Sequence, residues 1–208
     1  MKTSIKSIIA LAVTAVVLTG STLTVNASEP KTTTVLSSVK KVTKIDVAGN
    51  VELILVQSTD ESVKVHDNYF ANNALVQQKD GELRISSFSK EKLTVVAYVN
   101  TLTEITASGD ATVKTVGKFS TLSLDVNLSD NATADLNTNT INLNTNLSNA
   151  SSLNLAGSTE EYNAKMGNFA KVSLAKFAAT STNIQSKSIV VAQVAKVTLP
   201  NEAEFLSL

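Results

Sequence analysis

The 208-residue sequence has no cysteine, no tryptophan and a single histidine. Without cysteine the chain has no disulfide, no thiol nucleophile, no cysteine-built zinc or iron–sulfur site and no lipid-modified cysteine. One histidine also excludes zinc motifs that need a pair, such as H-E-x-x-H. We therefore expect neither a cofactor nor a metal centre.

The sequence also has no excess of positive or negative charge and few aromatic residues. Lys and Arg number 18 against 18 Asp and Glu, and aromatic residues make up 4% of the chain. A nucleic-acid-binding protein needs a basic face, and bases are commonly stacked on aromatic rings. The composition therefore argues against a nucleic-acid partner. Hydrophobic residues, at 43%, are numerous enough for a folded core.

Residues 1–27 have the pattern of a secretory signal peptide. Lys2 and Lys6 precede the apolar stretch IIALAVTAVVLTG, and the small residue Ala27 ends a typical cleavage site. An uncleaved anchor is the alternative, but the stretch is shorter than the roughly 20 residues that cross a bilayer. No other apolar run reaches that length. We expect an exported chain without a membrane span after cleavage, located in the periplasm, at the cell surface or outside the cell.

Two further regions follow the predicted signal peptide. Residues 28–43 are polar, rich in Ser and Thr, and predict a flexible leader. From Lys44 onward, apolar and polar residues alternate, as in Val51, Leu53 and Leu55, which is typical of strands with one buried face. We predict a single all-β domain over 44–208.

The second half of this domain is repetitive. Its small-residue turns recur about every 20 residues, a period typical of solenoids. Between the turns, aliphatic side chains alternate with polar ones. The turns are Ser108-Gly109-Asp110-Ala111, Ser129-Asp130-Asn131-Ala132, Ser148-Asn149-Ala150 and Gly167-Asn168-Phe169-Ala170, and the aliphatic rows are Leu122, Leu124, Val126, Leu128 and Ile141, Leu143, Thr145, Leu147. This pattern predicts a right-handed parallel β-helix with coils of about 20 residues. The alternative is an antiparallel β-sandwich, which would favour tight hairpin turns.

The chain resembles the bacterial head GIN domain family, whose members are regarded as autotransporter adhesin head domains. The resemblance rests on three segments, KIDVAGNVELILVQ (44–57), DGELRI (80–85) and VVAYVNTLTEITASGDATV (95–113). It implies an exported protein with a β-helical fold and an adhesive or surface role. The sequence departs from the family pattern at the turns after Ser129 and Ser148, where the usual glycine is absent.

No arrangement of residues predicts a catalytic site. His66 and Asp67 are adjacent, so on a strand their side chains point to opposite sides, and no G-x-S-x-G elbow occurs. Asp110 and Asp130 lie in aligned turns and could form a pair of carboxylates that cleaves a glycosidic bond. Arg84 is the only arginine available to hold such a polymer. We expect no catalytic residues and keep a polysaccharide-active enzyme, using acidic corner residues, as the alternative.

The most distinctive polar feature is the row Asn142, Asn144 and Asn146. On a strand these three side chains share one face. An array of amides could bind a glycan or a protein of the envelope or cell surface. In the alternative interpretation, the face is only solvated and its amides hydrogen-bond from coil to coil.

Together these features predict an exported, non-enzymatic β-solenoid that serves as an interaction module of the bacterial cell envelope or surface, with an adhesive role. Besides the polysaccharide-active enzyme, a purely structural envelope protein remains open, because a repetitive scaffold presents the same long faces with or without a ligand.

Overall fold

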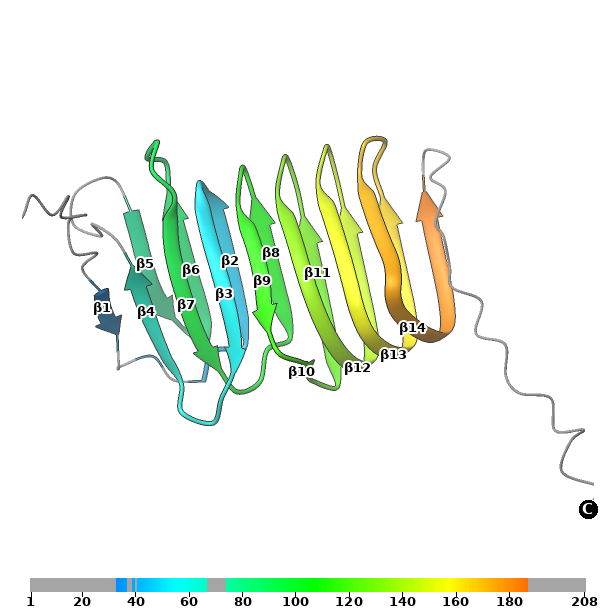
Figure 1. The fold of residues 1–208 in the computed structure, drawn as a ribbon, viewed down its shortest axis with the longest axis horizontal. Helices are drawn as coiled ribbons and strands as arrows, with labels where there is room; N and C mark the ends of the chain where they lie inside the picture. Colours follow the sequence, from blue (N-terminus) through cyan, green and yellow to red (C-terminus); the bar gives the residue numbers. More distant parts are fainter. Residues whose placement is uncertain (1–32, 37–38, 40, 67–73, 187–208) are drawn as a thin grey trace, which may run out of the picture. The chain divides into compact units, whose positions relative to one another are not determined.

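The computed structural model describes residues 33–36, 39, 41–66 and 74–186. They belong to the second of two compact units, Lys31–Leu208. The predicted signal peptide and Asp67 lie outside the described residues, which are strands joined by turns and contain no helix (Figure 1). The all-β prediction is confirmed.

The strands are joined by hydrogen bonds into one curled sheet with two arms. The first arm contains β1, β4, β7, β3, β9 and the first halves of β12–β14, and the second arm contains β5, β6, β2, β8, β11 and the second halves of β12–β14. The short β10 pairs with the middle of β12. The strands are β1 (Thr33–Leu36), β2 (Lys44–Gly49), β3 (Val51–Gln57), β4 (Ser62–His66), β5 (Ala74–Lys79), β6 (Glu82–Ser87), β7 (Leu93–Val99), β8 (Glu104–Ser108), β9 (Thr112–Val116), β10 (Phe119–Ser120), β11 (Ser123–Leu128), β12 (Thr133–Leu147), β13 (Ser152–Met166) and β14 (Lys171–Ser186).

From β8 and β9 to β14 the neighbouring strands run parallel, and the chain advances by about one predicted repeat at each step. Asp125 lies opposite Glu104, Asn144 opposite Asp125, and Asn163 opposite Asn144. Equivalent side chains therefore stack from one coil to the next. The turn alignment needs one correction, because Ser151, and not Ala150, occupies the place of Ala132.

A parallel β-helix over the whole domain is not confirmed, because the strand orientations are mixed. β4 runs antiparallel to both β1 and β7, and β5 runs antiparallel to β6. The β5–β6 hairpin turns at Asp80 and Gly81, which both have positive φ, 51° and 81°. Asp-Gly is the dipeptide that favours such hairpins, since both residues tolerate this backbone conformation.

The strand order also departs from the chain order. β2 lies between β6 and β8, and β3 lies between β7 and β9. The coil formed by β2 and β3 is therefore inserted between two later coils, as the positions of these strands in Figure 1 show. Part of the predicted leader also joins the sheet, since Thr33–Leu36 form β1 and both Val39 and Val42 are buried.

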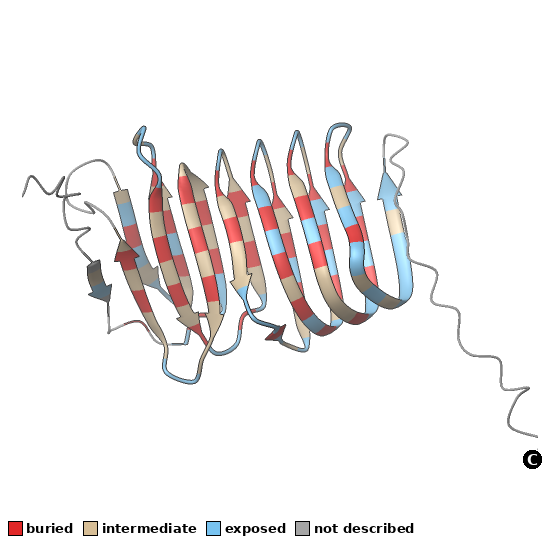
Figure 2. Ribbon diagram, viewed as in Figure 1, coloured by how far each residue is buried: buried red, intermediate tan, exposed pale blue. Residues whose placement is uncertain are grey.

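The core is a single cluster of aliphatic side chains contributed by both arms. Figure 2 shows the alternation of buried and less buried residues, along most of the strands, that produces it. At roughly 25 cal/mol per Å² of apolar surface, this burial is the main stabilising contribution. Its members include Leu53, Leu55, Val95, Val113, Leu124, Val126, Leu136, Leu143, Leu147 and Leu153.

Two side chains predicted to lie in this interior are exposed instead. Leu122 is 74% exposed and Ile141 is 42% exposed. β12 bends between its halves, and there Ile141 and Asn142 both lie outside the core, which resets the alternation. Leu122 precedes β11 at the equivalent place, and its carbonyl accepts the N–H of Ile141 at 3.0 Å. Thr145, also predicted to face inward, is buried.

Candidate functional site

A row of polar side chains crosses the outer side of the second arm. Strand register places Glu104, Asp125, Asn144, Asn163 and Asn183 next to one another on β8, β11, β12, β13 and β14. We call these five residues the polar row. They come together because successive coils repeat about every 20 residues, although the sequence separates the first from the last by four turns.

Hydrogen bonds between side chains connect members of the polar row. Asn144 Nδ2 donates to Asp125 Oδ1 at 2.8 Å, and Asn163 Nδ2 donates to Asn144 Oδ1 at 3.2 Å. The predicted coil-to-coil amide contacts are therefore present at Asn144. Each amide in such a chain still has donor or acceptor capacity left over, because an Asn side chain has two N–H donors and an oxygen with two lone pairs.

A second row lies beside the first, two residues further along each strand. Asn127, Asn146, Lys165 and Gln185 are neighbours in register. Asn146, Lys165 and Gln185 are exposed. Within the described part of the chain, no side-chain hydrogen bond ties Asn146 to another residue. This second row therefore offers polar groups directly to solvent.

The two rows line a shallow, open groove with a volume of about 470 Å³. Asn144 and Asn146, two of the three predicted residues, belong to its lining, whereas Asn142 lies nearer the bend and does not. The sequence interpretation missed Asn163, Lys165, Asn183 and Gln185. The signal that finds them is the register offset of about 20 residues from Asn144 and Asn146.

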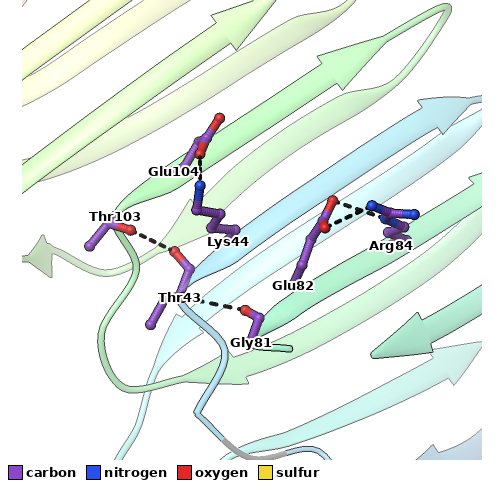
Figure 3. Close-up of polar contacts among 7 residues, drawn as sticks. All are labelled: Thr43, Lys44, Gly81, Glu82, Arg84, Thr103 and Glu104. Atoms are coloured by element: carbon purple, nitrogen blue, oxygen red, sulfur yellow. Dashed lines mark hydrogen bonds and ion pairs between the residues drawn. The ribbon is translucent and has the colours of Figure 1, made fainter. Parts of the chain in front are cut away.

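Ion pairs flank the groove on the side of β2 and β6. Lys44 Nζ lies 2.8 Å from Glu104 Oε2, and Arg84 donates twice to Glu82, at 2.9 Å each (Figure 3). The hydrogen bond from Lys44 to Glu104 raises the pKa of Lys44, and the hydrogen bond from Arg84 lowers the pKa of Glu82. These four charges are paired with one another, so the remaining charged side chains of the groove lining are Asp125 and Lys165.

Asp110 and Asp130, the acidic residues of the aligned turns, are not opposite each other, since Asn131 contacts Asp110 and Asp130 contacts Gly109. Asp130 accepts hydrogen bonds from the Gly109 N–H at 3.1 Å and from Asn149 Nδ2 at 3.0 Å, while Asp110 accepts one from Asn131 Nδ2 at 3.1 Å. Both carboxylates thus bridge neighbouring turns. Asp125 and Asp135 are engaged similarly, by Asn144 and Asn154 respectively.

The turns after Ser129 and Ser148 keep their backbone conformation although they lack the glycine that is usual there. Asp130 and Asn149 have φ of 58° and 55°, close to the 70° of Gly109 one coil earlier. Asp and Asn are the non-glycine residues that adopt this left-handed conformation most readily. The turn geometry therefore persists after the glycine is replaced, and the new side chains add hydrogen bonds between coils.

His66 is half-buried at the end of β4, with Thr33 and Thr94 opposite it in the two neighbouring strands. In the residues that the structure describes, no group of three His, Asp or Glu side chains could hold a metal ion.

A second hollow, not foreseen from the sequence, lies along the bend of the long strands. It has a volume of about 940 Å³ and is lined by Leu122, Ile141 and a series of Ser and Thr side chains. The alternation of the sequence predicts Leu122 and Ile141 in the interior, and for that reason it does not reveal this hollow.

The family model described as "Putative auto-transporter adhesin, head GIN domain" matches residues 41–197. The chain belongs to this family. The match confirms the resemblance carried by residues 44–57, 80–85 and 95–113, and it spans all the strands from β2 to β14. A search among curated proteins found no match.

Solved structures support the fold at low sequence identity. A "putative adhesin" from Parabacteroides distasonis has a TM-score of 0.61 and 17% identity, with 77% of this chain and 80% of that chain covered. A "putative lipid binding protein" from the same species has a TM-score of 0.61 and 10% identity, covering 76% and 79%. A "putative adhesin" from Parabacteroides merdae has a TM-score of 0.57 and 17% identity, covering 76% and 78%. At these identities the likeness concerns the fold alone.

No helix that could cross a membrane is found in the portion of the chain that the structure describes.

Proposed function

We propose that this head GIN domain protein is an exported, non-enzymatic interaction module of the bacterial cell envelope or surface, with an adhesive role, and that its groove binds a glycan. The observation that carries the proposal is the open groove on the second arm, lined by amide side chains from successive coils, including Asn144, Asn146 and Asn163. Adhesion requires such a partner-facing surface and no chemical step.

The chemistry of the groove suits a neutral, hydroxyl-rich ligand. Amide groups both donate and accept hydrogen bonds, as sugar hydroxyls do. The flanking charges of Lys44 and Glu104 are paired with each other, and the two remaining charges of the lining, Asp125 and Lys165, are opposite in sign, so the groove has no excess charge that would select an anion or a cation. Neighbouring strands place equivalent amides about 4.8 Å apart, which favours an extended partner over a compact one.

The scaffold that we propose for this groove is a right-handed parallel solenoid over β8 to β14, with the antiparallel strands β1, β4 and β5 at its other end. The parallel registers support it, because each coil adds an aliphatic rung to the core and a polar rung to the outer face. Export is proposed on the signal-peptide pattern of residues 1–27.

Absence of catalysis is proposed because Asp110 and Asp130 are not opposite each other and both bridge neighbouring turns. Asp110 and Asp130 bridge turns through hydrogen bonds to Asn131, Gly109 and Asn149. Release of reducing ends from a glycan panel, lost in Asp110→Asn or Asp130→Asn, would contradict this part of the proposal.

The binding proposal is tested by retention of the protein on an array of bacterial and host glycans. The variant Asn144→Ala/Asn146→Ala removes two groove amides and should lower retention by roughly tenfold or more. Asn154→Ala is the matched control, since Asn154 donates to Asp135 one coil earlier on the first arm, as Asn144 does to Asp125. It removes one of these coil-to-coil hydrogen bonds outside the groove and should keep full retention.

Two outcomes would overturn the proposal. Equal retention of the groove variant and the wild-type protein would remove the groove as the binding face. If no glycan retains the wild-type protein but envelope proteins bind it, the partner is a protein. If neither glycans nor envelope proteins bind it, a purely structural role is favoured.

A further inference from the structure

The last described strand, β14, has an open edge. One edge of β14 pairs with β13, and no other described strand pairs with the second edge, as the end position of β14 in Figure 1 shows. An unpaired edge of this length is normally covered or protected, because its free N–H and C=O groups can pair with another chain.

The core is also uncovered at β14. Val172, Ala179 and Ile184 are only half-buried there. Their register partners one coil earlier, Leu153, Thr159 and Ala164, are buried. The difference means that the stack of inward side chains ends at β14 without a final layer among the described residues.

The sequence after β14 contains a copy of its first half. Residues 191–199, VAQVAKVTL, follow residues 171–179, KVSLAKFAA, at an offset of 20, which is also the offset between Asn163 and Asn183 in adjacent strands. The residues of 191–199 that fall on the inward positions of β14 are all apolar. They are Ala192, Val194, Val197 and Leu199, on the positions of Val172, Leu174, Phe177 and Ala179.

The copy extends to an irregularity of the strand. The register between β13 and β14 shifts between Asn154 and Ala156, so β14 has one extra residue there, and Ala175 and Lys176 are both exposed. The same pair, Ala-Lys, recurs as Ala195-Lys196. Inward positions change from even to odd numbers at this pair in β14, and the matching positions of 191–199 are apolar on both sides of the pair. Val191 and Ala195 are apolar as well, whereas the polar residues Gln193, Lys196 and Thr198 all fall on outward positions.

Two further observations limit the segment. The family model extends to residue 197, past the end of β14. Pro200 follows Leu199, and proline has no N–H to continue a ladder of hydrogen bonds. The segment that carries the strand pattern is therefore 191–199.

We propose that the open edge of β14 is the docking site of residues 191–199 of the same chain, which pair in parallel with Lys171–Ala179. In this arrangement Ala192, Val194, Val197 and Leu199 cover the half-buried side chains of β14. The segment closes this edge on the first arm against pairing with a second molecule.

The first test compares two charges placed on neighbouring residues of the full-length chain. Val194→Asp puts a carboxylate against the apolar stack and should lower the thermal midpoint by roughly 5 °C or more. Gln193→Asp places the same charge on the outer face and should leave the midpoint unchanged. Equal effects of the two substitutions, or no effect of either, would overturn the proposal.

The second test uses the absence of native cysteine, which makes introduced thiols unique. Ser173→Cys/Gln193→Cys places two thiols opposite each other in the proposed register, and a short bifunctional thiol reagent should join them within one molecule. Ser173→Cys/Thr198→Cys is the off-register control and should react far less. Equal yields from both pairs would contradict the register. Cross-linked dimers in place of joined monomers would show that a second copy occupies the edge.

Discussion

The hydroxyl oxygen of Tyr162 lies 3.1 Å from Oγ1 of Thr145, which belongs to the preceding coil, and both side chains are buried. The Tyr162 ring also meets the ring of Phe177 edge to face, with 5.5 Å between centroids. Burial raises the pKa of Tyr162, while the hydrogen bond with Thr145 lowers it. Three successive long strands, β12, β13 and β14, are thus connected through one side chain.

Tyr162→Phe should destabilise the protein through the hydroxyl of Thr145. The substitution keeps the ring but leaves Thr145 Oγ1 buried without this partner, which costs about 1–2 kcal/mol. Denaturant unfolding followed by circular dichroism measures the change. Tyr98→Phe is the control, because Tyr98 is only half-buried, and it should change stability by less than about 0.5 kcal/mol. Equal losses in the two variants would contradict this role of the hydroxyl.

Gly157 occupies a position where no side chain fits. It has φ of 97°, and a Cβ built there would lie 2.0 Å from the carbonyl oxygen of Thr138. Gly157→Ala should therefore add a steric clash to backbone strain and cost about 2–5 kcal/mol.

Gly117→Ala is the control for Gly157→Ala, because Gly117 has φ of 75° but nothing within 4 Å of its built Cβ. It should show the strain alone, about 1–2 kcal/mol. Thermal unfolding of both variants separates the two effects, and a Gly117→Ala loss as large as that of Gly157→Ala would refute the clash.

The ion pair between Glu52 and Lys114 on the first arm makes stability depend on pH. Lys114 Nζ lies 2.7 Å from Glu52 Oε1, and this hydrogen bond lowers the pKa of Glu52 below its ordinary value of 4.5. A lowered pKa in the folded state stabilises the protein above pH 4.5, and this contribution is lost as the pH falls through the folded-state pKa. Glu52→Gln should therefore be less stable than wild type at neutral pH and equally stable at low pH.

Asp46 provides a comparison of opposite sign. Burial, more than the charge of Glu82, raises the pKa of Asp46 in the folded protein. Ionised Asp46 therefore opposes folding once the pH exceeds the ordinary value of 3.8. Asp46→Asn should raise the thermal midpoint at neutral pH and leave it unchanged well below pH 3.8. Parallel pH profiles for Glu52→Gln and Asp46→Asn would contradict both assignments.

Local periodicity predicted much of this fold. Alternation along 122–128 and 141–147 indicated strands, and the recurrence of small-residue turns indicated coils of about 20 residues. The offset of 19 that places Asn144 beside Asp125 differs by one residue from the predicted alignment of Ala132 with Ala150. The outward position of Asn144 and Asn146 follows from the same alternation. These features depend on residues within about one coil of each other, which is the range over which a sequence pattern is informative.

The features that were missed depend on contacts between distant parts of the chain. Lys44 of β2 lies opposite Glu82 of β6 on one side and Glu104 of β8 on the other. No local pattern predicts which strands will lie beside β2. The bend in β12 could not be read from alternation either, because Ile141 is apolar although it is exposed. The only local signal for the antiparallel β5–β6 hairpin is the dipeptide Asp80-Gly81.

The side-chain amide signals of ¹⁵N-labelled protein test most directly whether the groove is the binding face. During titration with a glycan retained on the array, the signals of Asn146, Asn163 and Gln185 should shift, while those of Asn137 and Asn154 on the first arm stay in place. Shifts confined to the first arm, with the groove signals unmoved, would contradict the account.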